Sequence, residues 1–294
     1  MKNHRPIGLL AFGLFALAMT SCVYLASGRV WTTDENDLAQ ALNGLESLVV
    51  NSQNGSITVQ GAEGAEEIAV HVVKRAGGKD DADAAACMEA IQVEKKVEGH
   101  TFHLSWKWAK PREKTWQASV SFEVRAPRQM TVAVESHNGA ISVSNMTGET
   151  TLLTHNGAVR INGLAADLKA QTHNGRIDVA DVVGDVDVET HNGAIVVAAV
   201  VSDVRIVTYN GGVEADLSGS EAVNGTITTH NGQVTVALRD KASARLACRT
   251  GNGAIHPDRD MSVTLKQRNR LEGQVGAGDG QLSVETHNGS ITLR

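Results

Sequence analysis

The chain has 294 residues, of which 41% are hydrophobic, so it is long enough for one large domain with a continuous core. Aromatic residues make up only 3% while glycine occurs 29 times, a balance that favours short strands and tight turns over a typical α/β enzyme. The formal net charge is −6 and no basic cluster lies beyond the N-terminal segment, which argues against a nucleic-acid partner.

Residues 1–22 are organised as an export signal. Lys2 and Arg5 precede an apolar run from Ile7 to Met19, which is too short to be a comfortable membrane span. The tetrapeptide Met-Thr-Ser-Cys that ends at Cys22 resembles the lipobox of bacterial lipoproteins, in which the cysteine is acylated and becomes the first residue. Val23 follows, where an Asp would retain such a lipoprotein at the inner membrane. We therefore expect an exported protein with a lipid anchor on Cys22, at the outer membrane or cell surface. An ordinary secretory signal cut nearby is the alternative.

Between the signal and the repeats, we expect a tether over residues 23–44 and then a segment over residues 45–128 that holds a first coil and a β-rich cap. The first coil is marked by Asn54-Gly55, and the cap is expected to close the end of the strand stack, whose open edges would otherwise recruit other chains. Three tryptophans fall on one parity of a predicted hairpin in this cap. They form either a platform for sugars or a hydrophobic closure of the cap, and they are Trp106, Trp108 and Trp116.

The main signal is a repeat over residues 129–294 that is marked by the dipeptide Asn-Gly. The first four steps between successive pairs are 18 residues long, the next two are 21, and the last is 36, which is two periods. Self-similarity at a fixed period is the signature of a solenoid or another repeat architecture. The pairs are Asn138-Gly139, Asn156-Gly157, Asn174-Gly175, Asn192-Gly193, Asn210-Gly211, Asn231-Gly232, Asn252-Gly253 and Asn288-Gly289.

Each repeat predicts two strands and a corner. Leu168 and Ala170 alternate with polar residues before Asn174-Gly175, and Ile177 and Val179 alternate after it. The inward parity changes across the dipeptide, so a corner is needed there, and Asn-Gly is predicted to supply it by tolerating positive φ. Three apolar rows with a parity change favour parallel coils stacked roughly 4.8 Å apart over an antiparallel meander of hairpins. The third row consists of Met146, Leu164, Val182 and Val200.

The eight-residue motifs of the repeat, such as Thr-His-Asn-Gly-Ala-Val-Arg-Ile and Thr-His-Asn-Gly-Arg-Ile-Asp-Val, resemble the bacterial "putative adhesin" family of DUF4097 type. The lead-in over residues 121–127 and the ending Gly-Ala-Gly-Asp-Gly before the last motif are similar to it too, and the resemblance covers residues 45–294. It implies an all-β fold, a right-handed parallel β-helix or β-solenoid, with no established catalytic residues. This chain departs from the family in having histidine where serine is more frequent.

The motif histidines form one row on the outside of the predicted solenoid. Parity places Thr154 inward and His155 outward, so the imidazoles are expected to stack about 4.8 Å apart, with Tyr209 interrupting the row. Stacked neutral rings that fill a solenoid face are one interpretation, and capture of zinc or copper and pH sensing are the others. The row lacks the closed ligand geometry of a committed zinc site. The candidate metal ligands are His137, His155, His173, His191 and His230, and His287 has the same motif position.

Two further rows and two cysteines complete the candidates. The motif asparagines are predicted to point inward and to form a structural ladder of side-chain amides. Cys87 and Cys248 remain if Cys22 is lipidated, and they are either two buried thiols or a disulfide. An acidic row after the second corner is expected to cap turn amides, with calcium bridging as the alternative. It consists of Glu149, Asp167, Asp185 and Asp203.

These patterns favour a binding or structural protein over an enzyme. Polysaccharide lyases use β-helices, but catalysis needs one converging site, whereas the repeat spreads its acids and histidines evenly. No sequence motif of a hydrolase, zinc protease or phosphate loop occurs. We therefore predict a non-enzymatic, adhesin-like envelope lipoprotein without a cofactor. Its expected partners are the membrane, through the lipid anchor, and an envelope protein or glycan. Metal binding through the histidine row is the first alternative, and a carbohydrate-active β-helix enzyme is the second.

Overall fold

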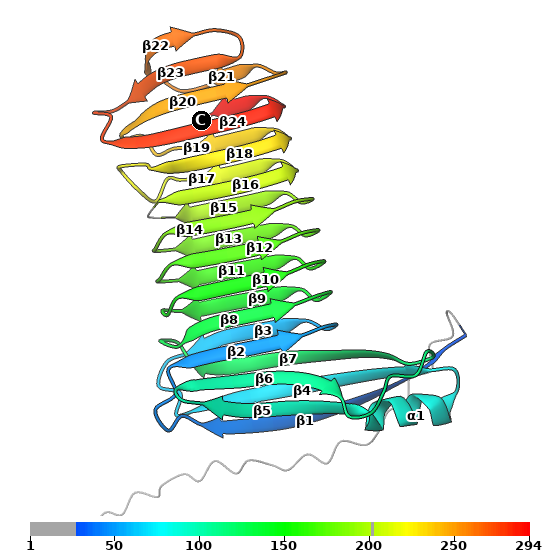
Figure 1. Cartoon of the computed structure of the whole chain (residues 1–294). Coiled ribbons are helices and arrows are strands. Elements are labelled where there is room, and N and C mark those ends of the chain that lie inside the picture. Colours follow the sequence, from blue (N-terminus) through cyan, green and yellow to red (C-terminus); the bar gives the residue numbers. More distant parts are fainter. Residues whose placement is uncertain (1–27, 201–202) are drawn as a thin grey trace, which may run out of the picture.

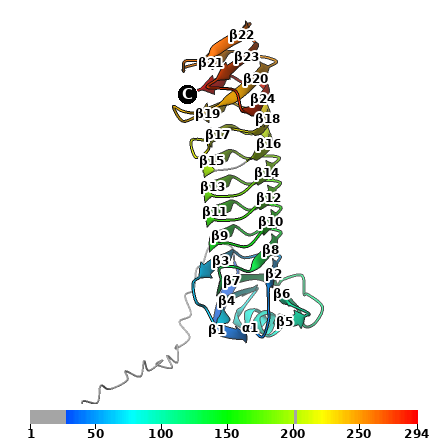
Figure 2. The ribbon, with the colours of Figure 1, turned by 90° about the vertical axis from the view of Figure 1, so that its left-hand side faces the viewer.

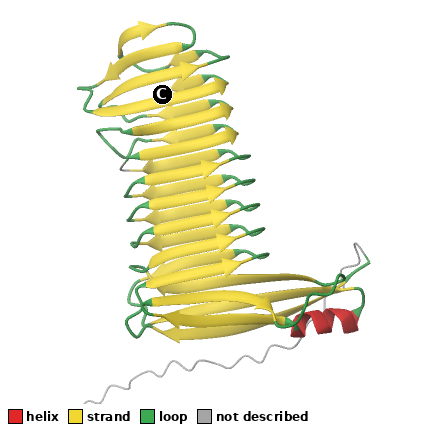
Figure 3. Cartoon of the chain, viewed as in Figure 1, coloured by secondary structure: helices red, strands yellow, loops and turns green. Residues whose placement is uncertain are grey.

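The structure of the chain is a computed structural model, which describes residues 28–200 and 203–294. Cys22 and the rest of the predicted export signal lie outside the described residues. The described part is an L-shaped molecule in which a tall stack of strands, the rod, stands on a broader base, the foot (Figure 1). Among the described residues the one helix, α1, lies at the far end of the foot (Figure 3), and no helix there has the length and hydropathy needed to cross a membrane.

The rod consists of two parallel sheets that face each other, and each coil gives one strand to each sheet (Figure 2). The Asn-Gly dipeptide lies between the two strands of a coil. The parallel stacking of successive coils in both sheets confirms the predicted β-solenoid. In chain order the coils are β2 (Ser47–Ser52) with β3 (Ile57–Ala62), β8 (Thr131–Ser136) with β9 (Ile141–Met146), β10 (Thr150–Thr154) with β11 (Val159–Leu164), β12 (Leu168–Thr172) with β13 (Ile177–Val182), β14 (Val186–Thr190) with β15 (Ile195–Val200), β16 (Val204–Asn210) with β17 (Val213–Asp216), β18 (Gly225–Asn231) with β19 (Val234–Ala237), β20 (Ala244–Thr250) with β21 (Ile255–Pro257), and β24 (Gly280–Asn288) with β25 (Ile291–Leu293).

The repeat period sets the register between neighbouring coils. Leu152 in β10 pairs with Ala170 in β12, one period later, and Val159 pairs with Ile177 in the opposite sheet. Every second residue points between the sheets, where it is removed from water. Each fully buried Val, Leu or Ile stabilises the fold by about 1.5–3 kcal/mol. The five residues predicted to be buried in one coil are all at most 2% exposed: Val159, Ile161, Leu164, Leu168 and Ala170.

The two corners of a coil are built differently from the prediction. No described motif glycine except Gly55 has a positive φ, so the expected left-handed conformation at Asn-Gly is wrong. Positive φ occurs near the other corner, at Asn145 (57°), Gly163 (70°) and Asp181 (55°). In each of these coils the residue with positive φ bends the second strand just before the third apolar row, so that Met146, Leu164 and Val182 turn back into the core. The three predicted apolar rows therefore belong to only two sheets.

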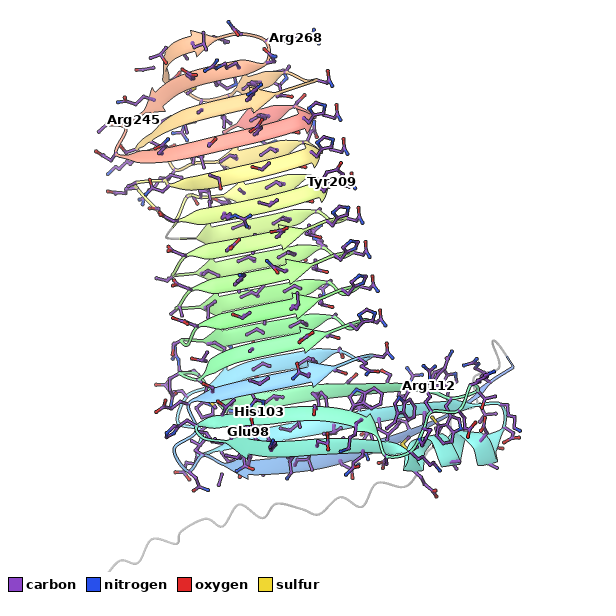
Figure 4. All side chains as sticks on the ribbon, viewed as in Figure 1. Glu98, His103, Arg112, Tyr209, Arg245 and Arg268 are labelled. Atoms are coloured by element: carbon purple, nitrogen blue, oxygen red, sulfur yellow. The ribbon has the colours of Figure 1, made fainter. Side chains whose placement is uncertain are left out.

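The foot is an excursion of the chain between the first and second coils of the rod. After β3 the chain forms β4 (Glu67–Gly78), α1 (Asp81–Glu89), β5 (Ile91–Glu98), β6 (Thr101–Trp108) and β7 (Gln117–Pro127) before it returns to the rod at β8. The excursion does not break the stack, because β3 lies between β7 and β9, and β2 lies between β6 and β8. The foot projects on the side of the rod where Tyr209 lies (Figure 4).

The predicted tether is wrong from Val30 onward. Residues 30–41 form β1 (Val30–Ala41), which pairs antiparallel with β4 along its whole length and makes the outer edge of one sheet. The burial pattern of β1 is only weakly alternating. The strand pairs through its backbone and carries Asp34, Glu35 and Asp37, charges that protect an edge from further pairing.

At the upper end of the rod the coils do not follow chain order. The C-terminal coil, β24 with β25, lies between the coil of β18 and β19 and the coil of β20 and β21. The connecting segment forms β22 (Ser262–Lys266) and β23 (Arg270–Val275), which pair antiparallel above β20 and cover its open edge. Antiparallel strands thus close both sheets at the foot, whereas at the upper end they close one sheet and the other ends at β21.

The two cysteines of the described region lie at opposite ends of the molecule. Cys87 belongs to α1 in the foot, Cys248 belongs to β20 near the upper end of the rod, and both are buried and free. They form no disulfide. Burial raises the pKa of the Cys87 thiol and raises that of Cys248 to about 12, so both stay protonated at neutral pH.

Candidate functional site

The aromatic side chains of the motif form a ring ladder along one edge of the rod, the edge marked by Tyr209 in Figure 4. Neighbouring ring centroids are 4.7–4.9 Å apart, and neighbouring planes differ by 2–25°. Each ring covers the face of the next, so mainly the ring edges are available to solvent. His155 and most other rings are exposed, as parity predicts. In order, the ladder consists of His137, His155, His173, His191, Tyr209, His230 and His287.

Beside the rings runs an amide ladder of asparagines. In each rung the Nδ2 of one asparagine donates to the Oδ1 of the asparagine below, over 2.7–2.8 Å. The prediction that these side chains point inward is wrong, because from Asn138 upward they are exposed. The buried position at the corner is occupied by the preceding threonine. The ladder runs Asn54, Asn138, Asn156, Asn174, Asn192, Asn210, Asn231, Asn288 and Asn252, which confirms that the last two coils are exchanged in space.

The threonine and the glycine of the motif are linked across coils. Thr172 is buried, and its Oγ1 donates to the carbonyl oxygen of Gly157 in the coil below, 2.9 Å away. The same bond recurs in six other coils over 2.7–3.1 Å. It satisfies a carbonyl that the corner removes from water, and such a group left unpaired costs about 1–3 kcal/mol.

Close approach of the backbone explains the motif glycine. A Cβ added at Gly157 would lie 1.9 Å from the carbonyl oxygen of Gly139, and one at Gly175 would lie 1.9 Å from that of Gly157. No side chain fits at that distance. Glycine is therefore required at this corner by the space between coils and not by its backbone angle. Each of the four residues of the Thr-His-Asn-Gly motif is therefore explained by its contact with the coil below.

The acidic row lies at the opposite corner, and two of its members accept hydrogen bonds from backbone amides. Oδ1 of Asp167 accepts from the backbone N–H of Asp185 at 2.9 Å, and Oδ1 of Asp185 accepts from that of Asp203 at 3.3 Å. These bonds agree with the capping interpretation over calcium bridging. On the neighbouring sheet surface Arg205 donates to Asp187 at 2.7 Å, and this bond raises the pKa of the Arg205 guanidinium.

The structure brings the predicted histidine ligands into one line without bringing them to one point. In a tetrahedral zinc site two imidazole nitrogens lie roughly 3.4 Å apart, as follows from Zn–N bonds of 2.0–2.1 Å. The centroids of His155 and His173 are 4.8 Å apart and their planes differ by 2°, so two stacked rings cannot share an ion without leaving the stack. Within the described ranges no group of three or more His, Cys, Asp or Glu side chains is placed to hold a metal ion.

Two hollows lie beside the ring ladder. The lower one has a volume of about 590 Å³ and lies in the inner angle of the L, because its lining includes Ser105 and Trp106 of the foot as well as His137, His155 and His173. The upper one, of about 510 Å³, follows His191, Tyr209, His230 and His287. Between them they cover most of the length of the ladder.

The hollows also contain residues that the motif analysis missed. Glu135, Glu189 and Glu285 line them, and each stands two residues before a ring of the ladder. Leu153, which is 43% exposed, occupies the equivalent position before His155. Strand alternation alone could have identified these residues, because residues two positions apart in a strand point to the same face of the sheet.

The tryptophans mainly close the foot. Trp106 and Trp116 are buried, at 7% and 3% exposure, and Trp108 packs between their rings at 5.5 and 5.9 Å. Nε1 of Trp106 donates to Oγ of Ser52, and Nε1 of Trp116 donates to Oδ1 of Asp83. Their faces are used inside the protein, which favours the closure interpretation over an open platform for sugars.

Fold and corner together define the class of the protein: a two-sheet parallel β-solenoid whose coils are joined by ladders of rings, amides and threonines. The chain belongs to the family described as Toastrack DUF4097, whose model matches residues 45–294. Among curated proteins none matches the chain.

Several solved structures match most of the chain at low sequence identity. A "putative adhesin" from Parabacteroides distasonis ATCC 8503 is 10% identical, with 89% of this chain and 97% of that chain covered and a TM-score of 0.49. A "putative lipid binding protein" from the same strain is 11% identical, with 89% and 96% covered and a TM-score of 0.46. A "putative adhesin" from Bacteroides fragilis NCTC 9343 is 11% identical, with 89% and 97% covered and a TM-score of 0.37. These names describe those proteins.

Proposed function

We propose that the chain is a non-enzymatic, adhesin-like binding protein of the cell envelope, which holds an extended ligand along the ring ladder. The observation that carries this proposal is the lower hollow in the inner angle of the L, which is lined by Ser105 and Trp106 of the foot and by His137 and His155 of the ladder. A ligand seated there contacts two surfaces at once. The ladder then continues upward as a regular series of ring edges, so a longer ligand gains contacts without needing a single deep pocket.

The chemistry of the hollow suits a polar polymer. Each neutral imidazole offers one donor and one acceptor, and the rings repeat every 4.7–4.9 Å. Glu135 adds a carboxylate and Leu153 adds an apolar patch. An envelope glycan or an extended protein segment presents hydrogen-bonding groups at comparable intervals, and we propose one of these as the ligand. Regular spacing along a line supports binding better than catalysis, which needs groups that converge.

We further propose that a lipid on Cys22 anchors the protein to the outer membrane. The support is the sequence of the export signal, which ends at Cys22, and the position of the first described residues at the foot (Figure 1). An anchor there leaves the rod free. Replacement of Cys22 by Ala should release the protein from the membrane fraction and abolish labelling with a radioactive fatty acid. Normal labelling of that variant would contradict lipidation at this cysteine.

Binding can be tested with two matched substitutions of exposed apolar residues. Leu153 lies in the lower hollow, whereas Val183, which is 58% exposed, lies at the opposite corner. Cell envelopes, with and without protease treatment, and purified envelope glycans are the probes. We expect Leu153→Glu to weaken binding about tenfold, equivalent to about 1.4 kcal/mol, and Val183→Glu to leave it unchanged. Equal effects of both variants, or binding to neither probe, would contradict the proposal.

A further inference from the structure

The dipeptide that builds the corners is also the one most prone to spontaneous loss of its side-chain amide. The backbone nitrogen after an asparagine can attack the side-chain carbonyl carbon, and glycine, which lacks a Cβ, obstructs this attack least. The chain contains twelve Asn-Gly pairs. Nine belong to the amide ladder, and the other three are Asn43-Gly44, Asn162-Gly163 and Asn224-Gly225.

Inside the ladder the asparagine side chains are held away from this reaction. Asn174 donates through Nδ2 to Asn156 and accepts through Oδ1 from Asn192, both over 2.7 Å. The following glycine is fixed as well, because Thr190 donates to the carbonyl oxygen of Gly175. Attack by the glycine nitrogen requires the amide to leave both ladder partners. Each bond contributes about 0.5–1.5 kcal/mol, so the ladder should slow the reaction at an internal rung by roughly tenfold to a hundredfold.

Asn43 lacks the side-chain restraints of the ladder, although Nδ1 of His100 is hydrogen-bonded to the carbonyl oxygen of the following Gly44 at 2.7 Å. It is exposed at the turn between β1 and β2, with φ of 39°, and Gly44 follows with φ of 81°. The turn is closed by the backbone N–H of Leu45, which donates to the carbonyl of Leu42 at 2.6 Å. Within the described ranges the Asn43 side chain has no hydrogen-bond partner. The space around Gly44 is open, since the nearest atom to an added Cβ would be 3.9 Å away.

The other two pairs outside the ladder are more restrained than Asn43. Asn224 accepts through Oδ1 from the backbone N–H of Gln281 at 2.9 Å. In the part of the chain that the structure describes, the Asn162 side chain has no hydrogen-bond partner. Its backbone, however, lies in the middle strand of three, β11, and pairs with Ser144 in β9 and with Ala180 in β13. A five-membered ring at Asn162 would therefore distort strands that the turn at Asn43 does not contain.

We propose that Asn43 is the deamidation site of the folded protein and that the amide ladder protects the nine Asn-Gly pairs within it. The backbone nitrogen of Gly44 bonds to Cγ of Asn43 and loses its proton, while Nδ2 leaves as ammonia. Water then opens the resulting succinimide at either carbonyl and gives aspartate or isoaspartate. The product adds a negative charge between β1 and the rod, and isoaspartate lengthens the backbone at that joint.

The test is peptide mapping by mass spectrometry of the folded, signal-free protein and of the urea-unfolded protein after incubation at mildly alkaline pH. In the folded protein we expect conversion at Asn43 to exceed that at Asn156, Asn174 and Asn192 by at least about tenfold. In the unfolded protein the four sites should convert at similar rates. Equal rates in the folded protein, or faster conversion inside the ladder, would overturn the proposal.

A ladder variant separates protection by hydrogen bonds from general burial. Asn174→Ala removes one partner from Asn156 and one from Asn192 but leaves Asn231 with both of its own. Conversion at Asn156 and Asn192 should rise several-fold, and conversion at Asn231 should stay at the wild-type rate. If Asn231 rises equally, or if Asn156 and Asn192 do not rise, the ladder is not the source of protection. Circular dichroism melting shows whether the variant remains folded under the conditions of the assay.

Discussion

The rod and the foot solve the same problem, the burial of two strand-rich faces, in different ways. In the rod every residue of the corner has a partner one coil away, and the same contact recurs from coil to coil. In the foot each contact occurs once, such as the bond from Trp116 to Asp83 at the start of α1. A repeated contact can be inferred from its period, whereas a single contact leaves no periodic trace. The comparison also predicts how damage should spread in each region.

The largest effect is expected from a charge in the core of the rod. Ile177→Asp places an unpaired carboxylate at a position that is fully buried, which should cost several kcal/mol and unfold the neighbouring coils. Hydrogen exchange followed by mass spectrometry should show lost protection in β10–β15, while β4 in the foot retains most of its protection. Simultaneous loss in rod and foot would show that the two regions do not behave as separate units.

Two adjacent glycines separate crowding from backbone freedom. A Cβ at Gly211 would lie 1.9 Å from the carbonyl oxygen of Gly193, whereas one at Gly212 would have its nearest neighbour at 3.4 Å. Gly211→Ala should therefore lower the free energy of unfolding by about 3 kcal/mol. Gly212→Ala should change it by less than about 0.5 kcal/mol. Urea denaturation measures both, and equal costs would contradict the steric explanation of the motif glycine.

The threonine row should give the same cost wherever it is interrupted. Thr172→Val and Thr190→Val each keep the shape of the side chain but leave a glycine carbonyl without its donor. Each should destabilise the protein by about 1–3 kcal/mol, and the two values should agree within about 0.5 kcal/mol. Clearly unequal values would show that position in the repeat does not fix the role of the residue.

The smallest effect is expected in the foot at low pH. The backbone N–H of Lys79 donates to Asp83 and lowers the pKa of this carboxyl below 3.8, and the indole of Trp116 donates to it as well. A depressed pKa contributes stability that is present above the unfolded value and is lost as pH falls through the folded value. Tryptophan fluorescence should therefore change as the pH falls below the usual range of an aspartate carboxyl. The change should be absent in Asp83→Asn, and its persistence there would assign it to another group.

The periodic features of the rod are the ones that the sequence alone could predict. The strands of the rod, their buried parity and the outward histidines follow from an 18-residue period, because alternation and period fix both face and register. The reason for the glycine did not follow, since the distance between coils depends on stacking and not on local conformation. Strand parity continued through the corner predicts inward asparagines, but the alternation ends where the chain turns, and the side chains are exposed there.

Non-local pairing accounts for the remaining differences. The sequence of β1 does not predict its pairing with β4, because its polar and apolar residues alternate only weakly and its partner strand lies elsewhere in the chain. The exchange of the last two coils is equally invisible to the period, since either order keeps Asn252 and Asn288 in the same ladder. The lower hollow could not be predicted from the sequence, because it depends on the direction in which the foot projects from the rod.

We propose the ring ladder as an extended binding face, and its stacked geometry predicts that it does not form a metal site. Titration of the folded, signal-free protein with zinc and with copper, followed by melting temperature, tests this claim directly. A metal that binds only the folded form adds about 2.7 kcal/mol at a hundred times its Kd. The stacked geometry predicts no such stabilisation for the wild type or for the His155→Ser, His173→Ser, His191→Ser triple variant. A large shift in the wild type that disappears in the triple variant would contradict it.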